Sequence, residues 1–105
     1  MAKYLLAFHG GSMPEDPAEQ AAALEAWGAW YTSIGAGVID PGNPVAFARS
    51  VASDGSASDG GGVDPVTGYT LIEAPDMDAA VEIASHCPLL GGGGRVEVAE
   101  TFNMG

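Results

Sequence analysis

His9, Glu73 and Glu97 are the residues of this chain best suited to acid–base chemistry, provided that the fold brings them together. A histidine paired with a carboxylate can act as a general base, because the carboxylate orients the ring and raises its basicity. A guanidinium beside such a pair can hold an anionic substrate by a bidentate contact. The candidate catalytic residues are therefore His9, Glu73 and Glu97, and the candidate ligand-binding residues are Arg49, Tyr69 and Asp40.

The same residue types have a structural interpretation, in which they pair with one another across an interface between protein surfaces. Other kinds of chemistry lack the motifs that they need. His9 and His86 fall on different expected elements, and no HxH, HExxH or Cys–His spacing of a zinc site is present. The glycines of segment 53–65 have no P-loop lysine, and no G-x-S-x-G motif occurs. We therefore expect no metal and no cofactor.

The elements that must position the candidate residues are clearest between Gly68 and Leu90. Residues 68–74 have the β-propensity of a strand, and the Pro75 that follows cannot donate to a sheet ladder. Asp76 is typical of a helix N-cap, and Pro88 ends the apolar helical stripe behind it. The pattern predicts a strand near 68–74 and a helix near 76–87.

The rest of the chain predicts three more strands and one more helix. Asp16-Pro17 is a helix start, and an aromatic stripe that includes Trp27 and Tyr31 predicts a helix near 17–34 whose apolar face is core. Segment 53–65 is rich in Gly, Ser and Asp and is expected to be a loop. The remaining strands are expected near 3–9, 45–52 and 95–101.

This β-α-β-β-α-β order predicts an α+β fold, the ferredoxin-like sandwich, with strand order fourth, first, third, second and both helices on one face. We expect the first and third strands to be parallel neighbours, so that His9 and Glu73 share one end of the sheet with Glu97. The first strand is apolar on both faces. A second copy of the chain is therefore the expected cover of the helix-free face, which would also carry Arg49 and Tyr69.

Bulk composition limits the function classes. The 105 residues predict one domain, 1–105, and 14 acidic against three basic residues give a net charge of −11. Nucleic acids and anionic membranes are excluded as partners, because neither would meet a basic patch. The single cysteine, Cys87, excludes an intramolecular disulfide. The apolar run at the N-terminus is too short for a signal peptide or membrane span, so a cytoplasmic protein is expected.

The stretch GYTLIEAPDMDAAVEIASHCPLL, followed by glycines and VEVAE, resembles the YCII-related domain family and its DGPF branch over most of the chain. The resemblance implies a dimeric α/β barrel, in which two ferredoxin-like subunits pack sheet against sheet. It also implies similarity to small isomerases and to decarboxylating or ring-cleaving enzymes, with a His–Asp pair suggested as the active site in some members. The DGPF signature itself is absent, because DGGGVDPVTG stands in its place.

Two functions remain open from the sequence. The first is a small-molecule enzyme or binder with a His–carboxylate pocket at the dimer interface, taking a small acidic or aromatic ligand. The second is a non-catalytic dimeric interaction or regulatory module, which the occurrence of DGPF-type relatives near sigma factors suggests. A cavity lined by His9, Glu97 and Arg49 would favour the first function, and a filled interface would favour the second.

Overall fold

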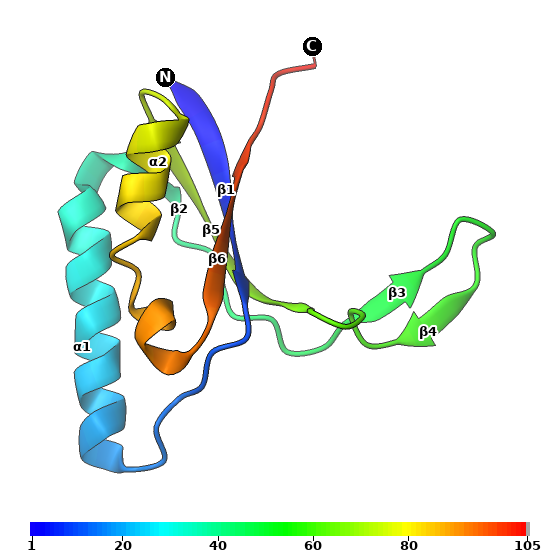
Figure 1. Cartoon of the computed structure of the whole chain (residues 1–105), viewed down its shortest axis with the longest axis horizontal. Coiled ribbons are helices and arrows are strands. Elements are labelled where there is room, and N and C mark those ends of the chain that lie inside the picture. Colours follow the sequence, from blue (N-terminus) through cyan, green and yellow to red (C-terminus); the bar gives the residue numbers. More distant parts are fainter. Residues whose placement is uncertain (105) are drawn as a thin grey trace.

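The structure, a computed structural model, describes residues 1–104 as a sheet covered by two helices, with a hairpin arm that projects from it (Figure 1). The strands are β1 (Ala2–His9), β2 (Val38–Asp40), β3 (Arg49–Val51), β4 (Ala57–Asp59), β5 (Val66–Ala74) and β6 (Arg95–Glu100). The helices are α1 (Pro17–Ile34) and α2 (Met77–Ala84), and two short 3-10 helices are η1 (Gly35–Gly37) and η2 (Pro88–Gly92).

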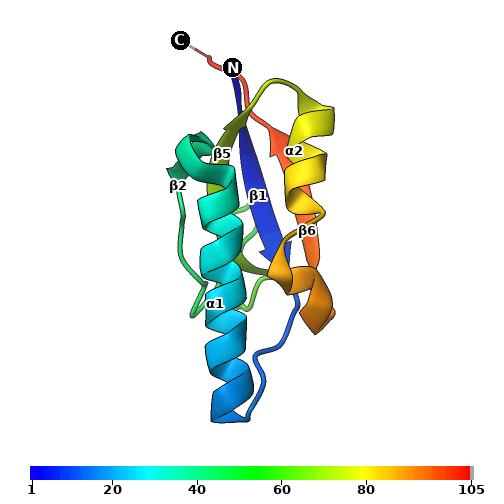
Figure 2. The ribbon, with the colours of Figure 1, turned by 90° about the vertical axis from the view of Figure 1, so that its left-hand side faces the viewer.

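The main sheet has the order β2-β5-β1-β6, and each neighbouring pair is antiparallel. Both helices lie on the same face of this sheet, as Figure 2 shows, so the other face carries no helix from the described residues 1–104. The predicted ferredoxin-like α+β fold is confirmed. Within residues 1–104, no helix combines the length and the apolar character that a membrane crossing requires.

The expected parallel pairing of the first and third strands is wrong. β5 runs antiparallel to β1, with His9 opposite Val66 and Lys3 opposite Glu73. In this β-α-β-β-α-β chain each helix runs back to the end of the sheet where the preceding strand began. The two parallel strands of each β-α-β unit are then separated in the sheet by an antiparallel strand. Glu73 therefore lies at the opposite end of the sheet from His9.

The second strand of the sheet is β2, not the predicted segment 45–52. The chain follows β5 only as far as Val45, whose N–H donates to the Thr67 carbonyl (2.9 Å). Pro44 still forms an antiparallel bridge with Gly68, whereas Pro41 has no N–H with which to continue the ladder of β2. The chain then leaves the sheet as the β3–β4 hairpin arm, which includes part of the expected loop at 53–65.

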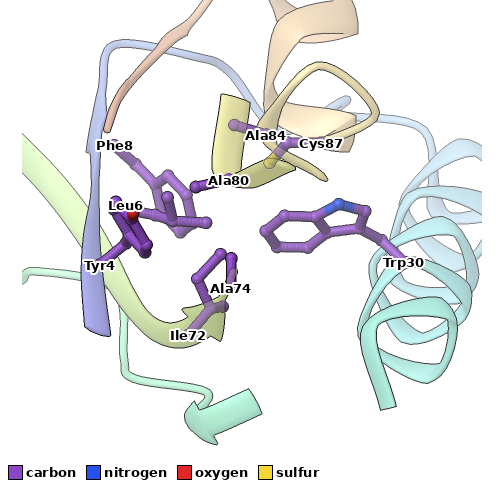
Figure 3. Packing of buried hydrophobic residues seen from close by; sticks show 9 residues of the cluster. All are labelled: Tyr4, Leu6, Phe8, Trp30, Ile72, Ala74, Ala80, Ala84 and Cys87. Atoms are coloured by element: carbon purple, nitrogen blue, oxygen red, sulfur yellow. The ribbon is translucent and has the colours of Figure 1, made fainter. Parts of the chain in front are cut away.

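The core lies between the sheet and the two helices (Figure 3). Tyr4, Leu6 and Phe8 alternate along β1 toward this core, as the period of two predicts. The buried tryptophan of α1 is Trp30, whose indole Nε1 donates to the Ile83 carbonyl of α2 at 3.0 Å. The remaining buried residues of the cluster are Ile72, Ala74, Ala80, Ala84 and Cys87.

The two helices begin as predicted, but their caps differ. The Asp76 side chain accepts a hydrogen bond from the Ala79 N–H (2.8 Å), which caps α2. Asp16 precedes α1 without a side-chain hydrogen bond, although its carbonyl accepts from the Gln20 N–H. α1 ends at the predicted Ile34, whereas α2 ends at Ala84 rather than near residue 87.

Candidate functional site

His9 lies at the centre of a charged cluster on the helix-free face of the sheet. It ends β1 opposite Arg95, and its side chain is buried although this face carries no helix. The ring Nε2 lies 3.0 Å from Glu97 Oε1, and Nδ1 lies 3.0 Å from the Asp64 carbonyl oxygen. Asp64 also accepts from Arg95, with its Oδ2 at 2.8 Å from Nε and 2.6 Å from Nη2.

These contacts engage both nitrogens of the His9 ring. A carbonyl oxygen only accepts, so Nδ1 donates to Asp64. Nε2 faces Glu97 Oε1, so each ring nitrogen contacts an oxygen atom of the protein. In this arrangement the cluster holds the base of the arm against the end of the sheet. No group of three or more potential metal ligands occurs among residues 1–104.

The other predicted site residues do not join His9. The antiparallel register places Glu73 at the other end of the sheet from His9. Arg49 lies on the exposed arm, where its Nε is 3.2 Å from Asp59 Oδ1. The Asp40 side chain stabilises the turn that follows it, because its Oδ1 accepts from the Gly42 N–H at 2.8 Å. Tyr69 is half-buried and lines a cavity described below. Of the candidate residues, the structure brings only Glu97 to His9.

A cavity of about 710 Å³ lies beside α1, at the end of the sheet where β1 finishes. Its floor and wall are aromatic, with ring centroids of Phe8 and Trp27 5.4 Å apart and those of Trp27 and Tyr31 6.1 Å apart. The other lining residues come from α1, two loops, β5 and η2: Gly10–Pro14, Ala23, Leu24, Ala26, Pro41–Pro44, Thr67, Gly68, Tyr69, Pro88, Leu89, Gly91 and Gly92. We call this cavity the aromatic pocket.

Two irregular segments line the aromatic pocket, and the local sequence explains their shape. Gly42 adopts a φ of +74°, and a Cβ built there would lie 1.7 Å from the Tyr69 carbonyl oxygen. Only glycine therefore allows segment 41–44 to approach β5 so closely. Across the pocket, Gly10 and Gly11 also have positive φ, which turns the chain out of β1 into the loop before α1. The Tyr31 hydroxyl donates to the Pro41 carbonyl at 3.2 Å and so ties α1 to segment 41–44.

Reasoning from the sequence missed the aromatic pocket. The aromatic stripe of α1 was predicted to lie in the core. This is correct for Trp30, but Trp27 and Tyr31 are only half-buried. The available signal was the pair of glycine- and proline-containing segments at 10–14 and 41–44. Their convergence depends on the antiparallel register of β1 and β5, which had been predicted as parallel.

Comparisons with known proteins agree with this fold. No family model matches the chain, and no curated protein matches it significantly. Among solved structures, the fold is similar to that of 5-chloro-2-hydroxyhydroquinone dehydrochlorinase (TftG) from Burkholderia phenoliruptrix AC1100, determined in complex with 2,5-dihydroxybenzoquinone. The identity is 17%, the TM-score is 0.53, and the match covers 98% of this chain and 95% of that chain. At this identity the likeness concerns the fold alone.

Proposed function

We propose that this protein is a YCII-like homodimer that binds a small molecule in the aromatic pocket. The observation that carries the proposal is the pocket itself: about 710 Å³, walled by Phe8, Trp27 and Tyr31. Cavities of roughly 300–1,000 Å³ with an apolar lining and a few polar groups are typical of small-molecule sites. The likeness in fold to a small-molecule enzyme supports this class of function by analogy only.

A pair of matched substitutions in α1 tests where the ligand binds. Ala23 lines the pocket, one helical turn before Trp27, whereas Ala22 is exposed and does not line it. Ala23→Phe should fill the pocket and abolish the binding of N-phenyl-1-naphthylamine, a neutral dye that fluoresces in apolar surroundings. Ala22→Phe carries the same change in helix propensity and should bind the dye like the wild type. Equal dye binding by both variants, or none by the wild type, would refute the pocket as the site.

The homodimer is proposed because the helix-free face of the sheet is apolar in its centre. Leu5 and Leu71 are paired across β1 and β5 on this face, and both are half-buried, with Ala7 beside them. A second copy would cover them, and a stable interface should bury more than roughly 1,000 Å² in total. Leu71→Lys should give monomers by light scattering, whereas Val81→Lys, on an exposed position of α2, should leave the dimer intact. A monomeric wild type at micromolar concentration would contradict the dimer.

Acid–base catalysis at the dimer face is a second candidate function. It is favoured by the 3.0 Å contact between His9 and Glu97, whose side chain is half-exposed. Catalysis would require a partner subunit or a ligand to draw Glu97 away, because both ring nitrogens are now engaged. His9→Gln separates the two proposals. Binding in the aromatic pocket predicts dye affinity within about twofold of the wild type, and a loss of binding would favour a site that includes His9.

A further inference from the structure

We infer that the ligand of the aromatic pocket is an uncharged aromatic molecule with one hydrogen-bonding group, and that the Asn43 side chain recognises this group. The inference rests on the proposed function, because it assumes that the pocket binds a ligand. It names the class of ligand and the residue that selects it.

The lining of the pocket argues against a charged ligand. Among residues 1–104, the lining includes no Asp, Glu, Lys, Arg or His, and Tyr31 and Tyr69 are its only ionisable members. A bound carboxylate would lose its hydration without gaining a cationic partner, which is strongly unfavourable. The net charge of −11 adds a repulsive field for anions. Of the acidic and aromatic ligands expected from the sequence, the pocket therefore favours the aromatic one.

The shape of the pocket favours a planar ring. The rings of Phe8 and Trp27 meet edge to face, at an interplanar angle of 66°, and Trp27 and Tyr31 are tilted by 32°. The half-buried Trp27 is thus fixed between two neighbours while part of its surface stays open to the pocket. A further aromatic ring can pack on it in an offset or edge-to-face arrangement.

Most side-chain hydroxyls of the pocket already form hydrogen bonds within the protein. The Tyr31 hydroxyl donates to the Pro41 carbonyl, the Thr67 hydroxyl faces the Phe8 and Gly10 carbonyls, and the Ser12 hydroxyl donates to Gly92. To donate to a ligand, these hydroxyls would first have to break their present bonds, although their oxygens can still accept. They are therefore poor donors to a ligand.

Asn43 differs from these residues because its backbone is fixed while its side chain is not engaged. Its carbonyl accepts from the Tyr69 N–H at 3.3 Å, and it stands between the Gly42 turn and Pro44. Its amide side chain has no hydrogen-bond partner among residues 1–104, and it lines the pocket. An amide both donates and accepts, so it can meet a phenol, an amine or a carbonyl.

Competition against N-phenyl-1-naphthylamine tests the inference with three probes of one shape: naphthalene, 2-naphthol and 2-naphthoate. We expect 2-naphthol to compete about two- to tenfold better than naphthalene, as one hydrogen bond allows. We expect 2-naphthoate to be the weakest competitor. Asn43→Ala should remove the preference for 2-naphthol over naphthalene.

The outcomes separate this inference from the proposed function. If the dye does not bind, or if Ala23→Phe leaves its binding intact, the proposed function fails. If the dye binds in the pocket but 2-naphthoate competes as well as 2-naphthol, the inference about charge is overturned. If Asn43→Ala retains the preference for 2-naphthol, Asn43 is not the recognising residue. Tyr69→Phe serves as the control and should keep the preference for 2-naphthol, because Tyr69 pairs with Ala7, which lies on the helix-free face of the sheet.

Discussion

Gly42→Ala is the perturbation that tests most severely how the aromatic pocket is built. Gly42 has a φ of +74°, and its added Cβ would lie 1.7 Å from the Tyr69 carbonyl oxygen and 2.7 Å from the Tyr69 carbonyl carbon. Both atoms belong to the backbone of the central strand β5, which cannot rotate away as a side chain can. Segment 41–44 must therefore move off the sheet if the variant is to fold.

Two effects make up the expected loss of stability in Gly42→Ala. An L-residue in the left-handed region costs about 1–2 kcal/mol. Moving the segment also weakens the hydrogen bonds from Tyr69 to Asn43 (3.3 Å) and from Val45 to Thr67 (2.9 Å), at about 1 kcal/mol each. We expect the free energy of unfolding to fall by about 3–4 kcal/mol in total. This is a large part of the roughly 5–15 kcal/mol of an ordinary domain.

Urea denaturation, followed by circular dichroism, measures this loss as a lower midpoint. Gly28→Ala is the matched control, because Gly28 lies inside α1 and a Cβ there meets nothing within 4 Å. That variant should gain up to about 1 kcal/mol, since alanine has the better helix propensity. If Gly42→Ala unfolds within about 1 kcal/mol of the wild type, segment 41–44 does not pack on β5 as described, and the wall of the pocket is wrong.

Three further predictions concern the core, the helix caps and the cysteine. Trp30→Ala should lower the free energy of unfolding by about 3–5 kcal/mol in urea denaturation, because Trp30 is buried and its indole donates to a carbonyl of α2. Trp27→Ala should lower it clearly less, because Trp27 is half-buried. Equal losses would contradict this packing. Asp76→Ala should cost about 1 kcal/mol through its lost cap, and Asp16→Ala should cost less because its side chain makes no cap bond; the reverse order would refute the cap assignment. Burial raises the pKa of the Cys87 thiol from 9.0 to about 11, so the folded protein should react slowly with a thiol reagent at pH 8. Relative to Cys87→Ala, the wild type should also lose stability between about pH 9 and 11, because the unfolded thiol ionises first; fast labelling of the native protein would contradict the burial.

Local pattern predicted most of the fold. Features that depend on residues close together in sequence appear where the pattern places them. These are the boundaries of α1, the start of β6 and the cap at Asp76. The segment after β2 was predicted poorly because its conformation is set by long-range contacts. Val45 still pairs with β5, and beyond it the chain leaves the sheet and pairs with itself as the β3–β4 hairpin.

The candidate site was predicted less well, because it depends on strand direction and not on residue type. His9 and Glu97 meet because β1 and β6 are antiparallel neighbours, as expected from the sequence. Glu73 was placed with them by the wrong direction of β5, and Asp64 was not placed with His9, because its carbonyl reaches His9 from an irregular segment. The aromatic pocket needs two loops and η2 to converge on α1, which no local pattern encodes.

The most direct test of the central claim uses the two indole N–H signals in a ¹H–¹⁵N NMR titration with 2-naphthol. Trp27 lines the aromatic pocket, whereas Trp30 is buried and hydrogen-bonded to α2, so the molecule contains its own control. We predict that the Trp27 indole signal and the amides of Gly11 and Gly42 shift and saturate, while the Trp30 indole signal stays in place. Shifts confined to His9, Arg95 and Glu97 on the opposite face of the sheet would contradict the claim.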